Sequence, residues 1–445
     1  MESHISPELL ANLSSSFEAD PKNRLAQNAV TKSGIGPVAL NREVVNTITH
    51  TYSHQIETAE STDQKGSGRC WLFAGLNALR VPAMKKMKLE KFELSQAYQM
   101  FWDKLEKGNY FLENIIETRD EPLTGRLVMW LLQDPIGDGG QWDMFINIVN
   151  KYGVVPKEVM PETFSSSQTG SMNDTLVTKL REYASILRTM NESGNDDVAL
   201  REKKNEMMQE YYTMLCIHLG TPPKTFVWEW RNKDKEFTRH GEITPLEFYQ
   251  EYVGIDLDDM VCLINAPTKD KPFNSLFTVQ YLGNVVGGQI VRYLNVDIAV
   301  MKKAAQQMIA DGKPVWFGCD VGKMLDRDLG ILDKNLYNYS LVYGTEFNLD
   351  KAARLDYGHS RMTHAMVLTG VDINEQGEPV RWRVENSWGD KGGDKGYMMM
   401  SDSWFDEYVY EITVHCDYLS DDVRAVRETD PIVLPPWDPM GALAR

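Results

Sequence analysis

One segment of this chain reads Gln64-Lys65-Gly66-Ser67-Gly68-Arg69-Cys70-Trp71-Leu72-Phe73-Ala74, and it joins a polar, glycine-containing turn to an apolar stretch. Leu72, Leu76 and Leu79 recur at helical spacing, so we predict a helix that begins at Cys70 and turns this face inward. Free backbone N–H groups and the helix dipole at such a terminus favour an anion. The thiolate is the reactive form of cysteine, and we therefore predict that Cys70 is a nucleophile whose pKa is lowered.

Gln64 precedes the thiol at a spacing that suits catalysis. Its side-chain N–H, together with a backbone N–H, would supply the two donors of an oxyanion hole. The alternative is that Cys70 is a buried structural cysteine at the start of a helix, the common role of a lone intracellular cysteine. The position of Gln64 and the residues described below favour the nucleophile.

Composition limits the class of protein. The chain has 445 residues, which exceeds one ordinary core, so we expect two or more lobes. Hydrophobic residues make up 42% and charged residues 25%, as in soluble globular proteins. The net charge is −17, and this argues against nucleic acid as the main partner, because phosphate binding requires a basic surface.

Location and cofactors follow from what the sequence contains. The first residues do not pair a basic segment with an apolar core, and no apolar run reaches the roughly 18 residues of a membrane span, so we expect a cytoplasmic protein. The five cysteines are widely separated and odd in number, which does not suggest a disulfide framework. Since the sequence lacks CxxC and HExxH spacing, we expect no metal and no cofactor. The four cysteines expected to be small buried apolar residues are Cys216, Cys262, Cys319 and Cys416.

A thiol nucleophile requires a base and a group that orients the base. His364 begins the apolar segment His364-Ala365-Met366-Val367-Leu368, which predicts a strand. A turn follows, and the return strand leads to Asn386, which such a hairpin would bring beside His364 to fix the imidazole tautomer. Trp388 would screen this hydrogen bond from water and line the substrate site.

Two other histidines are alternative candidates for the base. His359 is the natural rival, but it lies in a polar loop, whereas His364 enters the apolar strand directly. We expect His415 to serve packing or to lie on the surface. His364 is therefore the predicted base.

Taken together, these residues resemble the papain-like cysteine peptidases. The resemblance rests on Cys-Trp at the start of a helix, His-Ala-Met-Val, and Asn-Ser-Trp-Gly, in that order. It implies that Gly139 and Gly140 pair with the substrate backbone, a role in which glycine permits close approach. Secreted members carry a disulfide where this chain has Ser67 and Gly137, and the absence of both cysteines agrees with a reducing cytoplasm.

The end of the chain narrows the resemblance to one family. Residues 434–445 read Leu-Pro-Pro-Trp-Asp-Pro-Met-Gly-Ala-Leu-Ala-Arg, and with residues 66–71, 139–144 and 265–272 they resemble the bleomycin hydrolase and bacterial aminopeptidase C family. The resemblance implies a homohexamer with active sites facing an internal chamber. It also implies a C-terminal arm in the cleft, where Ala442, Leu443 and Ala444 contact the substrate and the terminal carboxylate attracts its α-ammonium group. Arg445 does not suit that role, and we hypothesise that it is removed.

The fold class expected is α+β: a papain-like two-lobe fold with a helical lobe, a β-barrel-like lobe, a helical insertion and a C-terminal arm. The expected function is a cysteine aminopeptidase of broad specificity that acts on peptides with a free N-terminus. The alternatives are an endopeptidase of the same fold and a non-catalytic scaffold. The expected divisions are 1–63, a leader packing on the core; 64–164, the helical lobe with the nucleophile; 165–225, a helical insertion and oligomer contact; 226–430, a β-rich lobe with His and Asn; and 431–445, the arm.

Overall fold

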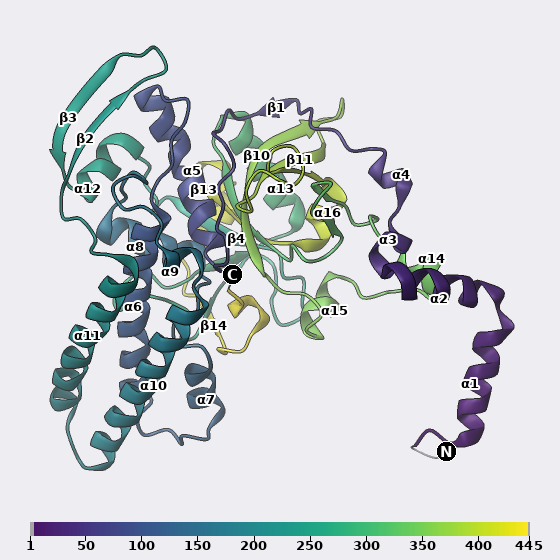
Figure 1. Cartoon of the computed structure of the whole chain (residues 1–445), viewed down its shortest axis with the longest axis horizontal. Coiled ribbons are helices and arrows are strands. Elements are labelled where there is room, and N and C mark those ends of the chain that lie inside the picture. The colour runs from purple at the N-terminus through teal and green to yellow at the C-terminus, as the bar shows by residue number, and fades with distance from the viewer. Residues whose placement is uncertain (1–3, 444–445) are drawn as a thin grey trace.

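The computed structural model describes residues 4–443, and these form a helical lobe and a sheet lobe that meet along one central helix (Figure 1). The helix is α5 (Cys70–Met87), which begins at Cys70 as predicted. It is apolar around most of its circumference because both lobes cover it, and Leu72, Leu76 and Leu79 are all buried. The α+β class expected from the sequence is confirmed.

The helical lobe packs around α5. Ser95 caps α6, where its Oγ accepts a hydrogen bond of 3.0 Å from the N–H of Tyr98. The apolar faces of α6 and α8 join α5 in one continuous core. The helices of this lobe are α6 (Gln96–Glu117), α7 (Arg126–Gln133), α8 (Trp142–Tyr152) and α9 (Phe164–Ser167).

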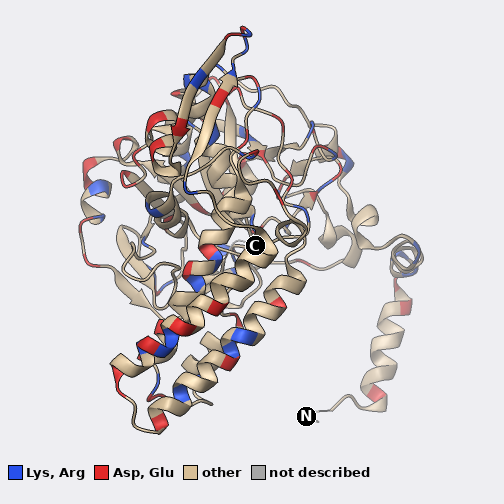
Figure 2. Ribbon diagram, turned by 60° about the vertical axis from the view of Figure 1, so that its left-hand side comes forward, with Lys and Arg blue, Asp and Glu red and all other residues tan. Residues whose placement is uncertain are grey.

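The predicted helical insertion is an antiparallel helix pair that extends from this lobe (Figure 1). Helices α10 (Gly170–Glu192) and α11 (Asp197–Leu219) both pack on α6. The buried residues include Leu176 and Leu180 of α10 and Tyr211 and Leu215 of α11. Acidic and basic residues alternate along the outer surface of the pair (Figure 2), as expected for solvated helix faces.

The sheet lobe contains one continuous mixed sheet, with strand order β14-β5-β6-β4-β13-β7-β10-β11-β12-β9-β8 and β1 beside β10. Strand β10 begins at His364, and its hairpin with β11 is the one predicted from the sequence. Helix α13 (Ile298–Ala310) covers one face. The strands are β1 (His54–Gln55), β4 (Met260–Ile264), β5 (Ser275–Val279), β6 (Tyr293–Asn295), β7 (Val315–Cys319), β8 (Leu325–Asp326), β9 (Ile331–Leu332), β10 (His364–Ile373), β11 (Pro379–Glu385), β12 (Tyr397–Ser401), β13 (Val409–His415) and β14 (Ile432–Leu434).

The beginning of the chain differs from our expectation of a leader packed on the core. Helices α1 (Pro7–Ala19) and α2 (Pro21–Ser33) contain no buried residue, and α1 stands away from the body in both views (Figures 1 and 2). Helix α2 contacts α14 (Tyr339–Tyr343), and the first buried residue among residues 4–443 is Ala39 in α3 (Ile35–Ala39). The described part of the chain, residues 4–443, therefore leaves the apolar side chains of α1 exposed.

The boundary at residue 226 also differs. A separate hairpin of β2 (Phe226–Arg231) and β3 (Phe237–Ile243) was expected to belong to the β-rich lobe. It packs on the helical lobe instead, because Trp228 and Phe248 form an aromatic cluster with Phe92.

One buried carboxyl group in the sheet carries a stability prediction. Glu411 of β13 is 1% exposed and has no ion-pair partner among residues 4–443. Burial and the neighbouring Asp143 raise the pKa of Glu411 to about 8. In the unfolded chain the group ionises near 4.5, so its contribution to stability declines as pH rises from about 4.5 to 8.

We predict that Glu411→Gln removes this decline. The variant should be more stable than the wild type at pH 7.5 by about 1–3 kcal/mol and nearly equal at pH 4.5. Urea denaturation at the two pH values measures the difference. The exposed Glu375→Gln is the matched control and should leave the pH dependence unchanged; if Glu411→Gln behaves in the same way, the prediction is wrong.

Candidate active site

Cys70 lies where the two lobes meet. It is fully buried at the first position of α5. This helix packs on β10, the strand that begins at the predicted base, His364. Residues almost 300 positions apart are thus brought together by the packing of α5 on β10.

His364 is held by Asn386. The distance between His364 Nε2 and Asn386 Oδ1 is 2.8 Å. The same Oδ1 accepts the N–H of Ser387 at 2.7 Å, so it is an acceptor and Nε2 must donate. This fixes the tautomer that leaves Nδ1 as the basic nitrogen. The Trp388 ring lies 4.8 Å from the imidazole, centroid to centroid, and covers it as predicted.

The amide of Gln64 has a fixed orientation. Its Oε1 accepts from Ser387 Oγ at 2.7 Å, and its Nε2 donates to the carbonyl of Ser67 at 2.6 Å. Because the amide carries two N–H groups, one donor remains. The backbone N–H of Gln64 also donates to Ser387, which ties the residue to the segment after Asn386.

The other two histidines are placed differently. His359 is exposed in the loop before β10. His415 lies at the end of β13, near Asp259 and Tyr418. The possible metal-binding atoms of His415, Cys416 and Asp417 lie within 4.8 Å of one another. Among the described residues, these three form the one such cluster of His, Cys, Asp or Glu side chains. We assign no metal to it, since exposed groups of this kind are common.

The segment that contains Gly139 and Gly140 is fixed by two buried lysines. Lys107 Nζ donates to the carbonyls of Gly137 and Gly139 at 2.9 and 2.7 Å, and Lys104 pairs with Asp138 at 2.7 Å. A Cβ atom on Gly140 would lie 2.5 Å from the Trp71 ring, so this position requires glycine for packing on Trp71. A rigid extended segment therefore borders the thiol.

The C-terminal arm reaches this segment. Its strand β14 pairs with β5, and Asp438 forms a buried ion pair of 2.9 Å with Lys271. The carbonyl of Ala442 then accepts a hydrogen bond of 2.7 Å from Gln141 Nε2, directly after the glycines. Lys271 belongs to the 265–272 segment that carried part of the family resemblance.

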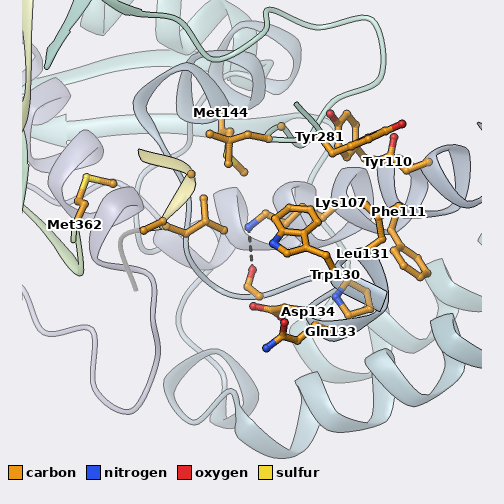
Figure 3. Close-up of a pocket in the computed structure, with 18 of the residues that line it drawn as sticks. Lys107, Tyr110, Phe111, Trp130, Leu131, Gln133, Asp134, Met144, Tyr281 and Met362 are labelled. Atoms are coloured by element: carbon orange, nitrogen blue, oxygen red, sulfur yellow. Dashed lines mark hydrogen bonds between the residues drawn. The ribbon is translucent and has the colours of Figure 1, made fainter. Parts of the chain in front are cut away.

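Ala442 and Leu443 line a cavity of about 690 Å³ beside the segment that contains Gly139 and Gly140 (Figure 3). Its walls come from α6, the loop after α7, and the residues just before His364. Ala444 and Arg445, which were also assigned to the arm, lie outside the described residues. The labelled residues of the cavity in Figure 3 are Lys107, Tyr110, Phe111, Trp130, Leu131, Gln133, Asp134, Met144, Tyr281 and Met362.

The pKa of the thiol differs from our expectation. Burial raises the pKa of Cys70 to about 12, whereas the helix N-terminus was expected to lower it. Burial likewise lowers the pKa of His364 to about 4. Each shift disfavours the charged form of its own group, the thiolate of Cys70 or the imidazolium of His364. Transfer of one proton from Cys70 to His364 instead creates two opposite charges side by side, and their attraction offsets the loss of hydration.

Several residues that support the site were missed by the sequence analysis. Ser387 orients Gln64, and Lys104 and Lys107 hold the glycine segment. Arg80 on α5 and Glu385 on β11 form a buried ion pair across the two lobes, 305 positions apart. The Asn-Ser-Trp motif contained a signal for Ser387, but no local pattern marks the buried charges.

The thiol of Cys70 is on α5 and the imidazole of His364 is at the start of β10, so both candidate groups lie where a helical lobe packs on a sheet lobe. That arrangement defines the class of papain-like cysteine peptidases. Within this class, the chain belongs to the Peptidase C1-like family, whose model matches residues 4–441.

Relatives match over the full length. The chain is 48% identical to Aminopeptidase C of Listeria monocytogenes, and the match covers 100% of both chains. It is 46% identical to Bleomycin hydrolase of Homo sapiens, with 99% of each chain covered. The crystal structure of pepw from Lactobacillus rhamnosis superposes with a TM-score of 0.98 at 47% identity, covering 100% of both chains. Among residues 4–443, no helix is long and apolar enough to cross a membrane.

Proposed function

We propose that this protein is a cysteine aminopeptidase that removes N-terminal residues from peptides with broad specificity. The observation that carries the proposal is the contact of the arm with the glycine segment, where Ala442 accepts a hydrogen bond from Gln141. We expect a chain in this position to occupy the cleft upstream of the scissile bond and to leave room for one residue before it. The names of the relatives Aminopeptidase C and Bleomycin hydrolase support a peptidase of this kind.

The proposed mechanism uses the four residues at the lobe junction. Cys70 transfers its proton to His364 Nδ1 and attacks the first peptide carbonyl. The free N–H of the Gln64 amide and the Cys70 backbone N–H stabilise the oxyanion. His364, oriented by Asn386, protonates the leaving amine and then activates the water that hydrolyses the thioester.

The proposed role of the arm is twofold. It blocks longer peptides, and its terminal carboxylate attracts the α-ammonium group of the substrate, which can contribute about 1.5–3 kcal/mol when the pair is desolvated. Gly139 and Gly140 bind the substrate backbone, and Trp388 lines the side of the leaving group. Removal of Arg445 would bring the carboxylate closer to this role; intact mass of the purified protein tests it, and a chain that retains Arg445 excludes it.

The test of function compares a peptide that has a free amino group with its N-acetylated form. We expect the free peptide to be hydrolysed and the acetylated peptide to be resistant. Equal rates would show an endopeptidase of the same fold. No hydrolysis of either peptide would favour a non-catalytic scaffold, the second alternative.

We also propose a cytoplasmic homohexamer without a nucleic-acid partner. The family resemblance supports the hexamer, and so does α1, where Leu9, Leu13 and Phe17 are 44%, 53% and 42% exposed on one face. Free cysteines support a reducing compartment. Light scattering and cell fractionation test these points: a monomer excludes the hexamer, and an extracellular location excludes the compartment.

The reactivity of Cys70 tests the proton transfer. We predict that iodoacetamide alkylates Cys70 at pH 6 about 10–100-fold faster in the wild type than in His364→Gln, since only the wild type can form the thiolate by transfer to an imidazole. The difference should persist to pH 9, because without the imidazole the thiol ionises only near its pKa of about 12. Equal rates at pH 6 would contradict the proposed pairing of thiolate and imidazolium.

A further inference from the structure

A cationic side chain lies next to the ring that covers the base. Arg327 belongs to the loop between β8 and β9, and its guanidinium carbon lies 4.5 Å from the centroid of the Trp388 ring. Trp388 in turn packs on His364 with a centroid separation of 4.8 Å. The three groups form a stack that leads from the buried imidazole to the surface.

The charge of Arg327 is not neutralised within the described part of the chain. The side chain is exposed and forms no ion pair among residues 4–443. The neighbouring Asp326 is occupied otherwise, since its Oδ1 accepts the N–H groups of Asp328 and Leu329 at 3.1 and 3.0 Å. Burial lowers the pKa of His364, the hydrogen bond with Asn386 raises it, and the charge of Arg327 lowers it further.

Arg327 lies on the side of the site away from the arm. Trp388 is bridged to Asp63, the residue before Gln64, so the stack runs beside the oxyanion segment. The arm, in contrast, shares its cavity with Met362 and Thr363, and that cavity includes neither Trp388 nor Arg327. If the arm occupies the upstream side, Arg327 faces the leaving group.

We propose that Arg327 binds the C-terminal carboxylate of short peptides, so that the enzyme selects tripeptides and tetrapeptides by both of their ends. This inference rests on the proposed aminopeptidase function. The guanidinium carbon lies over the Trp388 ring, and among residues 4–443 its N–H groups form no ion pair, so they can make a bidentate contact with a carboxylate. The distance from His364 to Trp388 is 4.8 Å, and that from Trp388 to Arg327 is 4.5 Å. At roughly 3.3–3.6 Å per extended residue, the two distances together correspond to two or three residues beyond the scissile bond.

The test measures kcat/KM for trialanine and for its C-terminal amide. The wild type should prefer the free acid about 5–10-fold, because the amide cannot form a charge-assisted contact, and the difference should appear mainly in KM. In Arg327→Gln the ratio should fall to about one, and Arg327→Lys should keep part of the preference. Added salt should lower the wild-type ratio, because the cation is exposed.

Lys334→Gln is the matched control, since it removes one exposed cation elsewhere on the chain and should keep the wild-type ratio. An equal rate for acid and amide in the wild type would overturn the inference even if no variant folds. An unchanged ratio in Arg327→Gln would also overturn it. Hydrolysis of an aminoacyl arylamide by the wild type separates the two proposals: if it persists in either case, the aminopeptidase function stands, and if it is absent, that function fails.

Discussion

Cys70→Ser is expected to reduce kcat for an aminoacyl arylamide by about 10⁴–10⁶-fold, because serine in place of the thiol does not ionise by proton transfer to His364. The oxygen is smaller than the sulfur, and the residue is fully buried at the start of α5, so the fold should persist. Steady-state kinetics measures the loss, and circular dichroism with thermal melting checks the fold.

Two outcomes separate this prediction from a general loss of structure. Cys319→Ser alters another fully buried cysteine, on the strand next to β10, and should retain turnover if the protein folds. Substantial hydrolysis by folded Cys70→Ser would exclude Cys70 as the nucleophile. It would exclude with it the mechanism proposed here.

Release of the arm should produce the second large effect. We predict that a chain ending at Leu434 hydrolyses an N-acetylated peptide at least about 10²-fold faster than the wild type, because the blocking segment is removed from the cleft and subsites upstream of the scissile bond open. Loss of the carboxylate contact should also weaken the preference for a free amino group by about 10–100-fold, the equivalent of about 1.5–3 kcal/mol. Cleavage of matched free and acetylated peptides measures both changes.

A point variant provides a milder form of this test. Asp438 is buried and paired with Lys271, so Asp438→Asn weakens the anchor of the arm and leaves Lys271 with the more exposed Asp270. We expect intermediate hydrolysis of the acetylated peptide. If neither the shortened chain nor Asp438→Asn cleaves it, the arm does not restrict access.

The candidate catalytic residues could be located from the sequence because their signals are local. Cys70 stands at the change from a polar turn to an apolar helix, and His364 at the start of an apolar strand, and both elements begin where expected. The hairpin between β10 and β11 followed from alternation and a turn, and it brought Asn386 to His364. Short-range patterns in the sequence were therefore sufficient to predict that Asn386 lies beside His364.

The features that were missed depend on contacts between distant segments. The pairing of Arg80 with Glu385 joins residues 305 positions apart, and neither residue has a neighbour in sequence that marks it as buried. The exposure of α1 was missed for the opposite reason: an apolar helical face predicts burial, but it does not say whether the partner lies in the same chain. The pKa of Cys70 likewise depends on total burial, which the helix start alone does not reveal.

The anchoring of the arm through β14 and Asp438 has a consequence for synthesis. Both lobes, the thiol and the imidazole precede residue 432 in the chain, so the ribosome makes the candidate catalytic residues before it makes the arm. If the arm restricts the cleft as proposed, a polypeptide that ends early, through a nonsense codon or a carboxypeptidase, would lack this restraint but keep its chemistry. Quality control of the last dozen codons would then protect neighbouring proteins from an unrestricted protease.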